Sequence, residues 1–221
     1  MRIDLHVHSR FSPDSLMELE TLARRCVDTG LDCIALTDHN TIEGALELRR
    51  LAPFPVIVGE EIKSAGGEII GLFLQEEIPR GLPPLETVRL IKEQGGLVSV
   101  PHPFDHFRRS VIERDVLMEI LPYVDVIEAF NARNTLQRDN RAAESLAQQH
   151  GILTTSVTDS HTPVEVGRCF VDVPAFDMTP AGLLEGLARG AQTRRQMLPL
   201  IHVATTLTKT RKRLAGLMQR G

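Results

Sequence analysis

The sequence predicts an α/β fold in which mostly parallel strands alternate with helices. Short apolar runs alternate along the chain with longer segments of helical spacing. The length of 221 residues suits one sizeable domain better than two. Strands that alternate with helices pair in parallel through right-handed crossovers. About seven such strands can close into a barrel, and a usual eightfold barrel needs about 250 residues, so this barrel would be small and irregular.

Strands are expected where short apolar runs are bounded by turn-forming residues. These runs are Arg2–Val7, Asp32–Leu36, Pro55–Ile62, Glu68–Leu74, Leu97–Val100, Val124–Phe130, Ile152–Val157 and Arg168–Val173. Gly66 and Gly67 lie between the third and fourth runs and predict a turn there.

Helices are expected where apolar residues recur at helical spacing. These segments are Leu16–Thr29, Ile42–Leu51, Pro84–Gln94, Val111–Leu121, Leu136–His150 and Pro180–Arg189. Gly30 and Gly95 follow two of them and are typical helix ends. The chain shows no repeat, low-complexity tract or flexible linker, so residues 1–190 are expected to form one barrel.

Residues 191–221 are expected to form a basic amphipathic helical tail. Over Pro199–Gln219, apolar residues recur at helical spacing and basic side chains lie between them. Two interpretations stay open. The tail packs as a terminal helix on the barrel, or it offers a basic surface to nucleic acid or a partner.

Composition narrows the classes of protein. Hydrophobic residues make up 42% and charged residues 24%, as in ordinary globular proteins. No apolar run is long enough to span a membrane, and the start, MRIDLHVHS, has no apolar signal region. Cys26, Cys33 and Cys169 are interpreted as reduced core residues. We therefore expect a cytoplasmic protein without a membrane partner.

The charge is unevenly distributed. Eight basic and no acidic residues follow Glu185, which leaves 17 basic against 29 acidic residues in residues 1–185, a net charge of −12 there. An acidic body argues against broad nucleic-acid binding by the barrel and is compatible with carboxylates gathered around cations.

Histidines and carboxylates follow the ends of five expected strands. The segments are Asp4-Leu5-His6-Val7-His8, Thr37-Asp38-His39, Gly59-Glu60-Glu61, Pro101-His102-Pro103 and Asp159-Ser160-His161, with Asp14 in the first loop. Residues two apart on a strand share a face, so His6 and His8 can share a metal. Active sites of barrels lie at the C-terminal ends of the strands. Imidazole and carboxylate ligands suit zinc, manganese or iron.

Each group also has an ordinary structural explanation. Asp14 and Asp38 are favoured helix N-caps, and His102 between two prolines fits a turn. His106 is a candidate for substrate contact or a solvated loop residue. His150 suits a helix C-terminus, and neither it nor His202 is given a chemical role.

Two or three divalent ions about 4 Å apart would clamp a phosphate and supply hydroxide near neutral pH. Asp159 and His161 are the candidate catalytic residues near the leaving oxygen, as ligands or as proton carriers. Arginine recognises phosphate through its planar fork. Arg108 and Arg109 are candidates, and Arg133 and Arg168 are preferred because they adjoin expected strands near the site.

These motifs, in this order over about residues 1–190, resemble those of the PHP (polymerase and histidinol phosphatase) family. Glu128-Ala129-Phe130-Asn131-Ala132-Arg133 and the run Asp159–Gly167 resemble its small stand-alone branch. The resemblance implies a distorted (β/α)7 barrel of the TIM type, with a trinuclear metal site. The ligands that it implies are His6, His8, Asp14, His39, Glu61, His102, Asp159 and His161.

The chain departs from the family pattern at one position. Family members often place a histidine or cysteine ligand at the end of the strand that here reads Ile127–Asn131. Glu128 and Asn131 stand there instead. Two metals therefore remain an alternative to three, with Asn131 or a water as the replacement ligand.

The function expected is that of a metal-dependent phosphoesterase that uses metal-activated hydroxide on a phosphate monoester or nucleotide. The metals would be Mn, Zn or Fe, and the partner a small phosphorylated substrate. A single-stranded nucleic-acid exonuclease, assisted by the basic tail, is the first alternative. A non-catalytic metal-binding module and an amidohydrolase-like hydrolysis are the others.

Overall fold

The protein is described by a computed structural model, in which the structure describes residues 1–197, 205, 208, 210 and 212. Within them, nine strands form one sheet in the order β7-β6-β5-β4-β3-β2-β1-β8-β9. The strands are β1 Arg2–Val7, β2 Cys33–Leu36, β3 Val56–Ser64, β4 Gly67–Leu72, β5 Leu97–Val100, β6 Val126–Asn131, β7 Leu153–Val157, β8 Phe170–Asp172 and β9 Ala191–Thr193. The helices are α1 Leu19–Thr29, α2 Glu43–Leu51, α3 Pro84–Glu93, α4 Arg114–Ile120, α5 Gln137–His150 and α6 Pro180–Ala188, with a 3-10 turn at Leu121–Tyr123.

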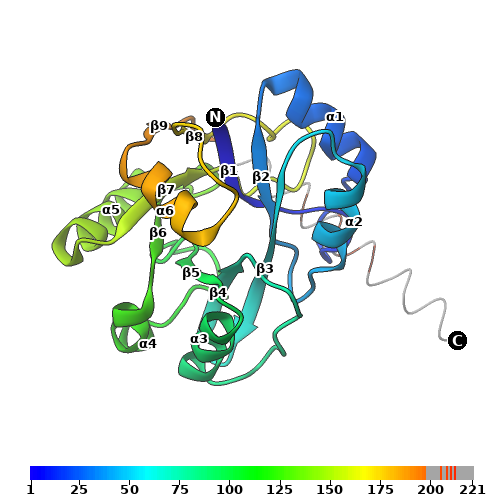
Figure 1. Ribbon diagram of the computed structural model, residues 1–221. Coiled ribbons are helices and arrows are strands. Elements are labelled where there is room, and N and C mark those ends of the chain that lie inside the picture. Colours follow the sequence, from blue (N-terminus) through cyan, green and yellow to red (C-terminus); the bar gives the residue numbers. More distant parts are fainter. Residues whose placement is uncertain (198–204, 206–207, 209, 211, 213–221) are drawn as a thin grey trace, which may run out of the picture.

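The sheet curls into a nearly closed barrel with helices around it (Figure 1). Strands β1, β2 and β3 are parallel, and so are β5, β6 and β7. The amide of His8 donates to the carbonyl of Ser160, 2.9 Å away, and this contact joins β1 to the segment after β7. The predicted distorted α/β barrel is confirmed.

Strands β4, β8 and β9 are antiparallel to their neighbours. The turn predicted at Gly66 and Gly67 reverses the chain, so β4 starts at the edge where β3 ends. The short polar strand β9 was not predicted, because Ala191-Gln192-Thr193 has no apolar alternation. It pairs with β8 just beyond residue 190, where the barrel segment was expected to end.

Two apolar layers hold the barrel together. One fills the interior, with Ile3, Leu5 and Ile57 among its buried members. The other lies between the sheet and the helices and includes Leu22 and Leu48. All three cysteines are buried and unpaired, as the sequence predicted.

An irregularity in β1 turns polar side chains inward. In β1 the pairing register shifts between Asp4 and Val7. Ile3 and Leu5 belong to the barrel interior, whereas Val7 packs in the outer layer. An extra residue in a strand changes which side chains face inward, so His6 and His8 face the barrel mouth.

The expected tail helix Pro199–Gln219 lies mostly outside the described residues. Thr205, Thr208, Thr210 and Lys212 are described, and they are helical. In the part of the chain that the structure describes, no helix is both long and apolar enough to cross a membrane.

Candidate metal centre

The predicted ligands meet at the C-terminal end of the barrel. His6 and His8 come from the end of β1, Glu61 from β3, and His102 and Asp159 from the loops after β5 and β7. All five side chains are completely buried. Ionisable groups are rarely buried so fully unless they are paired or bind a metal.

The first cluster joins β1, β3 and the loop after β7. The Nε2 atoms of His6 and His8 lie 2.9 Å apart. Oε2 of Glu61 lies 3.4 Å from His6 Nε2 and 3.3 Å from His8 Nε2. Oδ1 of Asp159 lies 3.6 and 3.4 Å from the same two nitrogens. The four side chains therefore surround one point.

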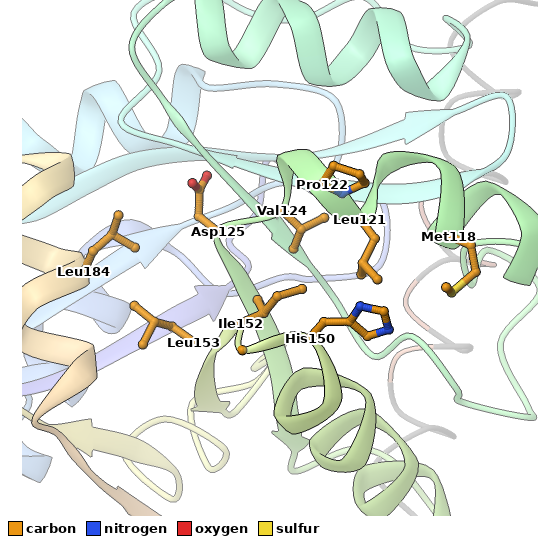
Figure 2. A pocket seen from close by; sticks show the side chains of 10 residues that line it. Met118, Leu121, Pro122, Val124, Asp125, His150, Ile152, Leu153 and Leu184 are labelled. Carbon is orange, nitrogen blue, oxygen red and sulfur yellow. The ribbon is translucent and has the colours of Figure 1, made fainter.

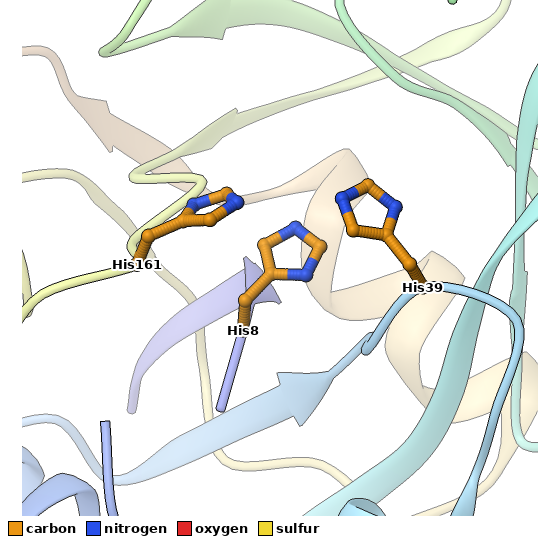
Figure 3. Close-up of side chains that lie close together, drawn as sticks. All are labelled: His8, His39 and His161. Atoms are coloured by element: carbon orange, nitrogen blue, oxygen red, sulfur yellow. The ribbon is translucent and has the colours of Figure 1, made fainter. Parts of the chain in front are cut away.

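The second cluster contains His8, His39 and His161, whose rings lie close together (Figure 3). They come from the end of β1 and from the segments that follow β2 and β7. The ring centroids of His39 and His161 lie 4.6 and 4.2 Å from that of His8. Asp14 closes this group, because its two oxygens lie 3.5 Å from His39 Nε2 and 3.3 Å from His161 Nε2. The structure thus brings Asp14 to the site, as predicted for a ligand.

The third cluster contains His39, Glu61 and Glu68, with His102 beside it. His102 Nε2 lies 3.1 Å from Glu61 Oε1 and 3.8 Å from Glu68 Oε2. Glu68 was not predicted as a ligand, because it lies near the start of an expected strand and not at its end. Since β4 is antiparallel, the start of this strand lies at the mouth of the barrel, and the Gly66-Gly67 turn was the signal that could have found it.

Glu61 links the three clusters. Its Oε1 faces His102, while its Oε2 faces His6, His8 and, at 3.0 Å, His39 Nδ1. Oε2 of Glu61 and Oδ1 of Asp159 are buried without a hydrogen-bond donor among the described residues. A carboxylate that uses both oxygens in this way suits a bridge between two cations, and the imidazole and carboxylate donors fit Mn, Zn or Fe.

The electrostatics also fit cations. Burial would lower the pKa of His6, but Glu128, Asp159 and Glu61 outweigh it and raise that pKa well above its ordinary value. Burial would raise the pKa of Asp159, but Arg108 and His6 hold it well below its ordinary value. Burial, with Arg133 and His8 nearby, lowers the pKa of His161 to about 3. His161 is therefore a neutral imidazole, the form that binds metals.

Two site residues have strained backbones. His102 has φ 29° and Asp159 has φ 53°, in the left-handed region that non-glycine residues rarely occupy. Such strain gathers at functional sites, where the surrounding structure enforces it. Here it turns both side chains toward Glu61 and the β1 histidines.

Glu128 orients the ligands from β6. Its Oε1 lies 2.6 Å from His6 Nδ1, and its Oε2 accepts hydrogen bonds from the His102 amide and from Asn131 Nδ2. A carboxylate behind a ligating histidine fixes the ring and its tautomer. The register of β6 also shifts between Glu128 and Phe130, and this shift allows Glu128 and Asn131 to face the same site.

Asn131 lies at the position where family members often place a ligand. Its Nδ2 also donates to Asp159 Oδ2, 3.2 Å away, and its Oδ1 accepts from the amide of Arg133. The side-chain oxygen therefore faces the backbone, and the amide group faces carboxylates. This arrangement favours a structural role for Asn131 over a ligand role.

The candidate phosphate-binding arginines separate into two groups. Arg108 donates to Asp159 and Asp105. Arg133 is buried, and its Nη1 lies 3.4 Å from both the Asp159 carbonyl and Glu165 Oε1. Arg168 is exposed and donates to the Val164 carbonyl. The structure therefore brings Arg108, which was ranked below Arg168, closer to the candidate ligands.

Other predicted residues lie at the edge of the site. His106 is exposed, and its Nδ1 lies 2.8 Å from Asp139 Oδ1. Asp38 caps no helix; it accepts hydrogen bonds from Ser9 and Ser12 and so holds the loop that carries Asp14.

A cavity of about 480 Å³ lies at the opposite end of the barrel (Figure 2). It is lined mainly by apolar side chains, together with Asp125 and His150. Among the described residues, no group of three potential metal ligands lies there. The candidate metal ligands of the described residues are therefore gathered at the C-terminal end of the barrel.

Comparisons with known proteins define the class. A two-domain protein from Bacteroides vulgatus, which contains a predicted PHP-like metal-dependent phosphoesterase, has a similar fold, with a TM-score of 0.69, 20% identity, and coverage of 88% of this chain and 65% of that chain. A lesion-specific endonuclease from Pyrococcus furiosus also has a similar fold, with a TM-score of 0.65 and 18% identity. The match covers 90% of this chain and 59% of that chain. The fold is thus that of the PHP-like metal-dependent phosphoesterases.

The family follows from sequence. The PHP domain model matches residues 4–100, and the PHP-associated model matches residues 137–191. The uncharacterized protein MJ1587 of Methanocaldococcus jannaschii is 39% identical over 145 residues, which span 60% of this chain and 82% of that protein. The chain belongs to the PHP family.

Proposed function

We propose that the protein is a metal-dependent phosphoesterase that hydrolyses a small phosphate monoester or nucleotide. The observation that carries the proposal is the position of the buried Glu61 between His6, His8, His39 and His102, which connects the three clusters of imidazoles and carboxylates. When bound, two or three divalent ions would neutralise phosphoryl oxygens and lower the pKa of a water molecule, so that hydroxide is available near neutral pH.

The protein's own residues would bind and orient the substrate. Arg108 donates to the carboxylate of Asp159 and Arg133 to its carbonyl. Both guanidinium groups therefore lie beside the candidate ligands, and guanidinium is the group that recognises phosphoryl oxygens through paired N–H groups. Arg108 and His6 hold the pKa of Asp159 well below its ordinary value, and burial lowers the pKa of His161 to about 3. Neither side chain would carry a proton near neutral pH, which supports ligand roles for both. Complete burial of His6, His8 and Glu61 keeps bulk water from the ligands.

The test is phosphate release from a panel of monoesters, nucleotides and short oligonucleotides, with metal-free protein reconstituted separately with Mn, Zn or Fe. Glu61→Gln keeps the shape of the side chain and removes its charge, and it should reduce release by at least about 100-fold. Glu60→Gln is the matched control. Glu60 is the next residue, but its Oε2 accepts from the Ile78 amide, away from the site.

The proposal would be refuted if protein shown to bind each metal released no phosphate from any of the small esters. Shortening of oligonucleotides without release from small esters would favour the second candidate, a nuclease. That candidate is supported by the structural similarity to the lesion-specific endonuclease of Pyrococcus furiosus.

A further inference from the structure

A histidine and a carboxylate form a pair beside the metal centre, outside the three ligand clusters. His106 Nδ1 lies 2.8 Å from Asp139 Oδ1, and the backbone amide of His106 donates to Asp139 Oδ2. Asp139 lies in the first turn of α5 and is only 1% exposed. A buried carboxylate is unfavourable unless its charge is compensated. The groups that face its Oδ1 are the imidazole and, 3.8 Å away, the guanidinium of Arg138.

The neighbours of Nδ1 determine which ring nitrogen of His106 carries the proton. Nδ1 is hydrogen-bonded to the carbonyl oxygen of Phe104, 3.0 Å away. Carbonyl and carboxylate oxygens accept hydrogen bonds, so Nδ1 is the donor and keeps its proton in the neutral ring. Nε2 is then the nitrogen that takes up and releases a proton. Among the described residues nothing bonds to Nε2, and the side chain is 55% exposed, so this nitrogen is accessible.

The loop that carries His106 also carries groups of the metal centre. His106 follows the candidate ligand His102 by four residues and precedes Arg108 by two. Arg108 donates to Asp159, and its Nε donates to Asp105 Oδ2, 3.0 Å away. Asp105 is buried. The loop is therefore fixed on both sides of His106, at the edge of the metal centre.

We propose that His106 is the general acid of the hydrolysis, and that Asp139 is the positioning residue that orients its ring. The inference rests on the proposed function. An ester oxygen that leaves as an alkoxide needs a proton in the transition state. Residues that bind cations cannot supply it, because imidazole and carboxylate ligands are deprotonated. His106 belongs to none of the ligand clusters, and histidine is the side chain that changes charge between about pH 5 and about pH 8.

The proposed step conserves atoms and charge. One water molecule supplies the hydroxide oxygen that forms the new bond to phosphorus, and the proton that this water loses goes to solvent. The bond between phosphorus and the ester oxygen breaks, and its electron pair remains on the ester oxygen. This oxygen takes the Nε2 proton of His106, so the products are an alcohol and inorganic phosphate. The neutral ring keeps its Nδ1 proton beside Asp139 and regains a proton at Nε2 from solvent.

The experiment compares His106→Asn with the wild-type chain, each loaded with the same metal, on an aryl and an alkyl ester. The aryl ester is p-nitrophenyl phosphate, whose leaving group departs without a proton. The alkyl ester is whichever of adenosine 5′-monophosphate and glycerol 3-phosphate the wild type hydrolyses faster. The variant should lose about 100-fold or more in kcat/KM on the alkyl ester and less than about tenfold on the aryl ester.

Two further variants complete the comparison. Asp139→Asn should show the same selectivity with a smaller loss, because the ring remains but is less well oriented. His150→Asn replaces an exposed histidine at the other end of the barrel and should change neither rate by more than about twofold. An equal loss on both esters in His106→Asn would show that this residue only holds the loop, and would overturn the general acid. A wild type that hydrolyses the aryl ester but neither alkyl ester would overturn it too.

A second measurement needs no activity. Long-range 1H–15N NMR correlations of metal-free protein at about pH 9, above the range in which histidine titrates, identify the protonated ring nitrogen. The signals that are absent from His106→Asn should show the proton on Nδ1, and a proton on Nε2 would overturn the proposed role. Metal-loaded protein that is inactive on every ester would instead count against the proposed function, and the NMR result would still decide the state of the ring.

Discussion

The two ends of the barrel contain the same kinds of residue in different surroundings. At the N-terminal end, His150 is exposed, and Asp125 accepts hydrogen bonds from Lys92 and the amide of Val98 beside an apolar cavity. At the C-terminal end, His6, His8 and Glu61 are fully buried and face one another. Residue type alone therefore does not mark the site.

The two ends differ in how many ionisable side chains come together and in the free-energy cost of burying them. Parallel strands bring their C-terminal ends to one mouth, where side chains from several loops can meet. Burying carboxylates and imidazoles together is unfavourable unless each charge is compensated. Strained φ angles at His102 and Asp159 add to this cost. A metal centre accounts for such an arrangement, and within residues 1–197 no comparable group of ligands is assembled at the other end.

The largest expected effect is on phosphate release, when a single histidine is replaced at one end of the barrel or at the other. His8→Ala removes an imidazole shared by two clusters, and phosphate release should fall by at least about 100-fold. His150→Ala, made at the other end, should leave release within about twofold of the wild type. If His8→Ala and the wild type, with metal content verified, were equally active, the C-terminal end would not differ from the other end in the way we propose.

Metal binding should also raise the free energy of unfolding, but only in proteins whose candidate metal ligands are unchanged. A ligand at about 100 times its Kd adds about 2.7 kcal/mol to the free energy of unfolding. We expect added Mn or Zn to raise the Tm of the wild type and of His150→Ala, but to have little effect on that of Glu61→Gln. Calorimetric melting of metal-free protein with and without each ion measures this directly.

Much of the fold and the candidate ligand set could be predicted from sequence. Alternating strands and helices predicted the barrel, and histidines and carboxylates at strand ends predicted that His6, His39 and His102 would meet. The prediction succeeded because the alternation of strands and helices implies parallel pairing, and the C-terminal ends of the parallel strands lie at one mouth of the barrel.

The features that the sequence did not predict depend on geometry that strand pairing creates. Glu68 reaches the site only because β4 is antiparallel. Glu128 and Asn131 face the same site, three residues apart, because of the register shift in β6. Arg108 could not be ranked above Arg168, since the course of a loop after a strand is not set by periodicity. Such features follow from tertiary contacts and not from sequence spacing.

The affinity of the C-terminal end for metal should depend on pH. The pKa values of His6, His8 and His39 are raised, chiefly because nearby carboxylates outweigh the effect of burial. A cation needs the neutral rings and must displace their protons. Affinity should therefore rise from about pH 6 to about pH 8, by up to about tenfold per pH unit for each proton displaced.

The stability of the metal-free protein should follow the opposite trend. A raised pKa in the folded state contributes stability that is complete below the unfolded value, about 6.5 for histidine, and is lost as pH rises through the folded value. Titration calorimetry at several pH values, in buffers of different ionisation enthalpy, counts the protons released. A metal affinity that does not change with pH would contradict the prediction that these histidines are protonated in the metal-free protein.

A smaller effect is expected at Asp4, which lies inside the barrel wall between the two ends. Burial raises the pKa of Asp4 to about 7, although Thr158 and His6 donate hydrogen bonds to it. Its contribution to stability is therefore full below its unfolded value and is lost as pH rises toward about 7. The slope is at most about 1.4 kcal/mol per pH unit for one proton.

Asp4→Asn removes this titration and keeps a side chain that can accept from the Thr158 amide. The unfolding free energy of the variant should fall less between about pH 5 and about pH 7 than that of the wild type. Denaturant melts at several pH values provide the comparison, and parallel slopes for the two proteins would show that Asp4 does not titrate in this range.

The smallest effect is expected at the N-terminal end itself. His150 is the last residue of α5, is followed by Gly151 with φ 65°, and is exposed beside the apolar cavity. Its contribution is limited to local contacts and to its interaction with the helix dipole, so His150→Gln should change the free energy of unfolding by less than about 1 kcal/mol. The Tm increase on metal addition should equal that of the wild type. A smaller increase in this variant would mean that the two ends are coupled, and that the barrel cannot be divided into a reactive and an inert end.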